Sequence, residues 1–158
     1  MNNGFRSTIL LSVRPEYMNK ILAGEKNIEI RRVRPQISSN ATILFYASSP
    51  EKQLVALARL TDVEILSPLD LWASSGTGSA LSKEEFLDYL SGRTYGVAIS
   101  FADLVEIDPP ITLSELRFIW PGFHPPQSHL FISESQLDEL RDSNLCLSQT
   151  VDNVEALL

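Results

Sequence analysis

The chain has 158 residues, of which 44% are hydrophobic and 21% are charged, as in an ordinary globular domain. A formal net charge of -7 argues against a protein that coats nucleic acid without regard to sequence, because such binding needs a net basic surface. One cysteine and two histidines cannot build a disulfide framework or a structural zinc site within one chain. We therefore expect no metal and no cofactor.

The charge is divided unevenly along the chain. Residues 1–34 hold seven basic and three acidic side chains, a net charge of +4, whereas the other 124 residues hold six basic and seventeen acidic ones, a net charge of -11. The acidic total thus conceals a basic N-terminal segment. No run of 18 apolar residues occurs, and the first apolar stretch predicts a strand instead of a signal peptide. These features predict a cytoplasmic protein without a membrane partner.

The N-terminal half predicts strands around one short helix. Thr8–Val13 is apolar and β-branched, and Pro15 then favours the start of a helix that Gly24 ends. Ile28 and Ile30 alternate with polar residues, which is the period of a half-buried strand. Further strands are predicted at residues 42–47, 54–66 and 95–107.

Gly, Pro and Ser residues divide the remaining segments. Ser74–Ala80 is predicted to be a loop, and the Ser82–Glu85 capping box predicts a helix. One helical turn, a proline-rich loop, a short strand and a last helix follow at residues 113–118, 120–128, 130–132 and from 133. About five strands and three short helices predict one α+β domain over residues 1–158, with a core at about 8–142 and a frayed tail at 143–158.

The densest polar cluster is GEKNIEIRR, residues 24–32, where the first helix ends and a strand begins. Glu29 and Arg31 are two residues apart and therefore leave the strand from one face, while the turn aims Lys26 toward the same place. Cations beside a carboxylate suit a polar ligand such as a nucleotide. The alternative is a surface ion pair on a solvated strand, which is common and contributes little.

The run from Ile9 to Arg32 resembles the opening of ASCH-domain proteins, a branch of the PUA-like superfamily, whose signature is G-x-K-x-x-E-x-R. Gly24, Lys26, Glu29 and Arg31 fill these places. The likeness continues in FYASSP, LSKEEFLDYLSGRTYGVAI and PPQS, at residues 45–50, 81–99 and 125–128. The resemblance implies a small PUA-like β-barrel with peripheral short helices, a cleft lined by the motif, and binding of RNA or a modified nucleoside.

The resemblance also leaves an enzymatic alternative open. Some ASCH relatives are amidohydrolases that act on acetylated cytidine, and others are ribonucleases. Lys26 matches the lysine of the amidohydrolases, but Glu29 stands where they have a threonine nucleophile, and a carboxylate cannot act as an activated hydroxyl. The main interpretation is therefore an RNA- or nucleotide-binding, regulatory module. In the alternative, a hydrolase, Lys26 and Glu29 form an acid–base pair that acts through water.

Several other side chains are candidate ligand contacts. Arg14, Lys20, Arg32 and Arg34 would extend a basic rim along a phosphate backbone, or are simply solvated. Tyr46, Ser48, Tyr95 and Trp120 are candidates for stacking or base-edge contacts, with core packing as the alternative. Gln127 and Ser128 lie in a proline-stiffened loop that either contacts a base or only closes the barrel.

The C-terminal part holds two histidines and an acidic segment. His124 and His129 have no cysteine or acidic partner at ligand spacing, so they do not predict a metal site. Residues 133–158 hold six acidic side chains and one arginine, a net charge of -5, which suggests a protein partner for this acidic region.

Overall fold

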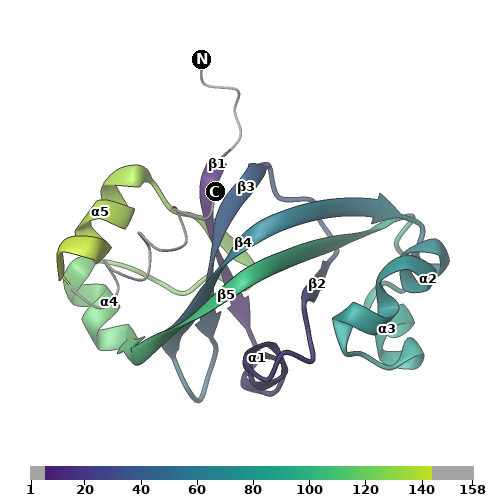
Figure 1. Cartoon of the computed structure of the whole chain (residues 1–158), viewed down its shortest axis with the longest axis horizontal. Coiled ribbons are helices and arrows are strands. Elements are labelled where there is room, and N and C mark those ends of the chain that lie inside the picture. The colour runs from purple at the N-terminus through teal and green to yellow at the C-terminus, as the bar shows by residue number, and fades with distance from the viewer. Residues whose placement is uncertain (1–5, 144–158) are drawn as a thin grey trace.

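A computed structural model describes residues 6–143, which form six strands and five helices (Figure 1). The strands are β1 Arg6–Val13, β2 Ile28–Arg31, β3 Ile37–Ala47, β4 Gln53–Leu66, β5 Gly96–Thr112 and β6 His129–Phe131. The helices are α1 Pro15–Leu22, α2 Pro68–Ser79, α3 Lys83–Tyr89, α4 Leu113–Ile119 and α5 Glu134–Ser143. The predicted α+β class is confirmed. Each of the six strands overlaps a segment predicted as a strand, and of the five described helices α2 alone lies where none was predicted.

All six strands belong to one sheet in the order β2-β5-β4-β3-β1-β6. β1 pairs with β3 in parallel, and the other neighbours are antiparallel. The long strands β4 and β5 curl across the molecule, so the sheet forms a half-barrel, with α2 and α3 at one end and α4 and α5 at the other (Figure 1). β2 and β6 are its two edges.

Local signals explain the short helices next to β1 and β5. Pro15 occupies the first turn of α1, Met18 and Ile21 bury its apolar face, and Gly24 follows with a φ of +79°, which glycine adopts at little cost. At α3 the predicted capping box is confirmed, because the Ser82 side chain accepts from the backbone N–H of Glu85 and the Glu85 side chain accepts in return.

The loop predicted over Ser74–Ala80 is wrong, because residues 74–79 are the second half of α2. Ser67 caps the start of this helix, and Ala80 ends it with a φ of +57°. A Cβ at Gly76 would lie 2.4 Å from the Trp72 ring, and one at Gly78 would lie 2.6 Å from the Ile28 side chain. The two glycines therefore permit close packing of α2 and do not form a turn.

The strand alternation directs apolar side chains into two cores. Ile9, Leu11 and Phe45 pack on the face that α1 covers, and Leu10 and Leu44 pack on the face toward α4 and α5. A third cluster joins α2 and α3 to β2 and β5, with the Trp72 and Phe86 rings in edge contact at 5.2 Å.

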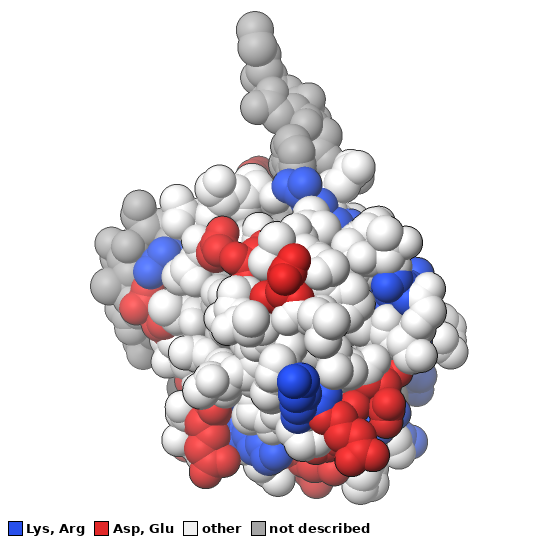
Figure 2. Space-filling model, turned by 90° about the vertical axis from the view of Figure 1, so that its right-hand side faces the viewer, with Lys and Arg blue, Asp and Glu red and all other residues white. Residues whose placement is uncertain are grey.

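The surface of the α2–α3 end carries charges of both signs around a large uncharged area (Figure 2). This face therefore has no continuous basic surface. In the part of the chain that the structure describes, no helix is both long and apolar enough to cross a membrane.

Candidate functional site

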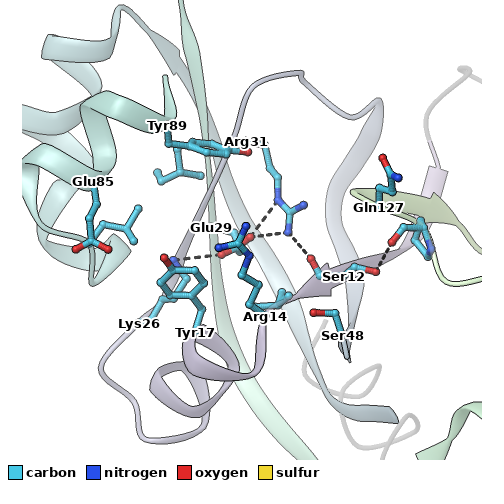
Figure 3. Close-up of a pocket in the computed structure, with 14 residues that line it drawn as sticks. Ser12, Arg14, Tyr17, Lys26, Glu29, Arg31, Ser48, Glu85, Tyr89 and Gln127 are labelled. Carbon is cyan, nitrogen blue, oxygen red and sulfur yellow. Dashed lines mark hydrogen bonds and ion pairs between the residues drawn. The ribbon is translucent and has the colours of Figure 1, made fainter. Parts of the chain in front are cut away.

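A pocket of about 420 Å³ opens where α1, β2, α3 and the loop before β6 approach one another (Figure 3). Its lining holds three cations, two carboxylates and two tyrosines in addition to smaller groups. The lining residues are Ser12, Val13, Arg14, Tyr17, Lys26, Glu29, Ile30, Arg31, Ser48, Leu81, Glu85, Tyr89, Pro126 and Gln127.

Lys26 lies at the floor of this pocket and is only 2% exposed. Its amine donates to the carbonyl of Ser79 at 2.7 Å, and it lies 3.2 Å from Glu29 Oε1 and 5.6 Å from the centre of the Tyr17 ring. The Ser79 carbonyl is one of the last of α2 and has no partner within the helix, so Lys26 caps α2. Burial lowers the pKa of Lys26, and Glu29 opposes this shift.

Glu29 is buried between Lys26 and Arg31. Its Oε2 accepts from Arg31 Nε at 3.0 Å and from Arg31 Nη2 at 2.6 Å, which makes a charge-assisted pair. Both carboxylate oxygens are thus engaged by cations. Glu29 thus lies within hydrogen-bond reach of both Lys26 and Arg31, which their spacing in the sequence could not establish.

Arg31 also connects the two edges of the half-barrel. From β2 its Nη2 donates to the carbonyl of Ser12 at the end of β1, at 3.0 Å, and its Nη1 lies 3.3 Å from both the carbonyl and the hydroxyl of Ser128. Ser12 in turn donates through its hydroxyl to the carbonyl of Pro126 at 2.6 Å. The guanidinium therefore fixes the loop before β6 against β2 (Figure 3).

The pocket lining also includes two tyrosines that were not among the candidate ligand contacts. Tyr17 comes from α1 and Tyr89 from the end of α3 (Figure 3). Lys20 and Lys26 lie over the Tyr17 ring, and the Arg32 guanidinium lies 4.4 Å from the centre of the Tyr89 ring. Tyr17 and Tyr89 both stand at the helical spacing of an apolar face, which is more typical of core packing than of ligand contact.

The sequence-predicted residues divide into two groups. Lys26, Glu29, Arg31, Arg14, Ser48 and Gln127 line the pocket, and Ser128 contacts Arg31 at its edge. Gly24, Arg32 and Tyr95 do not line it.

Tyr46 and Trp120 were predicted as candidate ligand contacts, and the structure places both in the core beneath α4 and α5. Tyr46 is 1% exposed, so its ring cannot stack on a base. Trp120 donates through its indole N–H to the carbonyl of Gln136 at 3.0 Å, which is a structural contact. Both residues therefore pack in the core and do not contact a ligand in the pocket.

Among residues 6–143, no group of three or more His, Cys, Asp or Glu side chains could hold a metal ion. His129 is half-buried, and burial together with the Arg31 charge lowers its pKa. Most of the acidic region that suggested a protein partner, residues 144–158, lies outside the described residues.

Comparisons with known proteins identify the family. A protein of Zymomonas mobilis named ASCH domain-containing ribonuclease is 30% identical over 135 residues, which cover 85% of this chain and 90% of that protein. The crystal structure of ASCH from Zymomonas mobilis matches with a TM-score of 0.82 and 30% identity, over 87% of this chain and 95% of that one.

A more distant match shows the fold alone. Human THYN1, solved in complex with DNA that contains 5-methylcytosine, has a TM-score of 0.53 at 14% identity, over 87% of this chain and 96% of that one.

The ASCH domain family model matches residues 11–104, and these residues include the whole G-x-K-x-x-E-x-R motif. The chain therefore belongs to the ASCH domain family.

Proposed function

We propose that this protein is an RNA-binding module that holds one nucleotide unit in the pocket beside Glu29 and Arg31. The observation that carries the proposal is the combination, in one pocket, of cationic side chains with two tyrosine rings. The volume of about 420 Å³ lies within the usual range of small-ligand sites. Such a pocket suits a single nucleotide better than a duplex.

The lining offers different groups to the different parts of a nucleotide. Arg14 is exposed, and within the described residues its side chain makes no hydrogen bond or ion pair, so its guanidinium is available to a phosphate. Gln127 is also exposed, and its amide both donates and accepts, as recognition of a base edge requires. The rings of Tyr17 and Tyr89 supply surfaces on which an unpaired base can stack.

Electrostatics supports a selective site and not a broad one. Three cations and two carboxylates line the pocket, so it is locally basic on a chain whose net charge is -7. Diffuse attraction to nucleic acid is therefore weak, and affinity must come from the pocket itself. The proposal includes a cytoplasmic location, which the low cysteine content favours.

A second candidate function is RNA cleavage at the same pocket, because the relative that is 30% identical is named a ribonuclease. In that case Lys26 and Glu29, 3.2 Å apart, would form the acid–base pair. Their contacts favour binding instead, since Lys26 is also held by Ser79, and Glu29 also by Arg31. Incubation of labelled RNA with the wild type and with Glu29→Gln separates the two functions. Cleavage that Glu29→Gln abolishes would establish the enzyme.

Fluorescence anisotropy tests the binding proposal with a single-stranded RNA octamer of mixed sequence and with its duplex. We expect the single strand to bind more tightly, and Arg14→Ala to weaken its binding severalfold without affecting the fold. Arg93→Ala removes an exposed arginine that does not line the pocket and serves as the matched control. Equal affinities of both variants and the wild type would contradict the proposal.

A further inference from the structure

A second pocket, of about 320 Å³, is lined by residues of α5 and of the strands β1 and β3. It shares no lining residue with the pocket around Glu29. Its lining is mostly polar: Ser7, Thr8, Asn40, Thr42, Glu134, Leu137, Asp138 and Arg141.

Two threonines make this pocket more than a surface groove. Thr8 and Thr42 are 4% and 6% exposed, and they are register partners on the parallel strands β1 and β3, so their side chains leave the sheet on the same face. Within the described residues neither hydroxyl has a hydrogen-bond partner. Neither hydroxyl oxygen is among the fully buried polar atoms that lack a partner, so both are open to the pocket and to a molecule bound there.

The charges around the two hydroxyls select the kind of ligand. Glu134 and Asp138 contribute two carboxylates, and the single cation, Arg141, lies 3.3 Å from Asp138 and is paired with it. The lining therefore has a net charge of -1, which disfavours an anion. Carboxylates only accept hydrogen bonds, and threonine hydroxyls accept as well as donate, so a positively charged ligand with N–H donors matches this lining best. Leu137 adds an apolar surface on which methylene groups can pack.

We propose that this second pocket binds a primary alkylammonium group, with its N–H donors on Thr8, Thr42 and a carboxylate of α5. A free polyamine and a lysine side chain share this chemistry. The site does not depend on the proposed RNA pocket, because the two have no residue in common.

Isothermal titration of the whole chain with spermidine tests the proposal. Tetramethylammonium at matched ionic strength is the control, since it carries charge but no N–H donor. We expect spermidine to bind and tetramethylammonium not to bind. A separate titration uses Nα-acetyl-lysine methylamide, which mimics a lysine side chain of a protein. If this compound binds and spermidine does not, the site is supported and its ligand is a protein lysine. Equal heats from spermidine and tetramethylammonium would overturn the proposal, because charge alone would then explain them.

Two variants locate the binding. Thr42→Val keeps the branched shape but removes a hydroxyl, and we expect at least a fivefold loss of spermidine affinity. Thr77→Val is the control at an exposed position outside this pocket. If Thr42→Val fails to fold, Glu134→Gln in the first turn of α5 tests the same pocket from an exposed position. Affinity unchanged in Thr42→Val, or in Glu134→Gln where that variant replaces it, would contradict the assignment.

Discussion

Arg31 of the edge strand β2 donates to the backbone carbonyl of Ser12 at 3.0 Å, and this contact joins β2 to β1, the neighbour of the opposite edge strand β6. The order β2-β5-β4-β3-β1-β6 places four strand pairings between β2 and β1, counted through the sheet. The same guanidinium also holds Glu29 and reaches Ser128. The motif arginine is therefore part of the fold as well as of the pocket.

Replacement of Arg31 with lysine should lower the free energy of unfolding by about 1–3 kcal/mol. An ammonium is a single point charge and cannot keep the planar set of contacts to Glu29, Ser12 and Ser128. Urea unfolding measures the change. Arg59→Lys is the control, because its pair with Asp103 is more exposed and should contribute less than about 1 kcal/mol. Equal, small effects of the two variants would refute the bridging role.

Lys26→Met should destabilise the protein by about 3 kcal/mol, the cost of removing one partner of a buried pair. The change deprives both Glu29 and the Ser79 carbonyl of a buried donor. Thermal unfolding provides the measurement. Lys20→Met is the matched control, since Lys20 donates to the neighbouring carbonyl of Ala80 at 3.1 Å but is only half-buried. A loss for Lys26→Met no larger than for Lys20→Met would show that burial of the pair is unimportant.

Acidification should destabilise the protein through His129. Its pKa is lowered in the folded state, first by burial and then by Arg31. As the pH falls below about 6.5, the unfolded chain takes up the proton before the folded one, so stability falls from about pH 6.5 toward the folded pKa. NMR titration of a His124→Asn variant follows His129 as the only histidine. Adding Arg31→Gln should raise the pKa of His129 part of the way toward 6.5, and an unchanged pKa would contradict the effect of Arg31.

Gly76→Ala should destabilise α2 although alanine is the better helix former. The added methyl group would lie 2.4 Å from the Trp72 ring, and overpacking costs about 1–3 kcal/mol against a gain of about 1 kcal/mol in helix propensity. Thr77→Ala, at an exposed neighbouring position, should be neutral or slightly stabilising. Circular dichroism melts compare the two variants. A higher melting temperature for Gly76→Ala would show that the ring moves away without cost.

Local patterns predicted those elements whose causes are local. The start of α1 at Pro15 and the Ser82–Glu85 capping box depend on neighbours within a few residues, and the structure confirms both. The whole of α2 was missed, and its second half was predicted as a loop because Gly and Ser residues usually mark loops. Here the small residues are required by the Trp72 and Ile28 side chains, and contacts of this kind leave no local pattern.

The sequence predicted only the part of the site that the G-x-K-x-x-E-x-R motif contributes. The motif indicated a cluster of Lys26, Glu29 and Arg31, but not that Lys26 would bind a carbonyl 53 residues away. Tyr17 was missed because its spacing is equally typical of a buried helix face. Tyr46, by contrast, was a candidate ligand contact, but it lies in an apolar strand and belongs to the core. Contacts between distant elements decide which of these aromatic rings meets the pocket, and such contacts leave no local pattern.

The most direct test of the account is an NMR titration of the ¹⁵N-labelled protein with the single-stranded RNA octamer. The side-chain signals of Arg31 Nε–H and of the Gln127 amide, together with the backbone signal of Tyr17, report on the pocket. We predict that these signals shift on addition of RNA, whereas the backbone signal of Phe118, on α4 and outside the pocket, does not. Shifts confined to other surfaces, or no shifts at concentrations at which RNA binds, would contradict the assignment of this pocket as the RNA site.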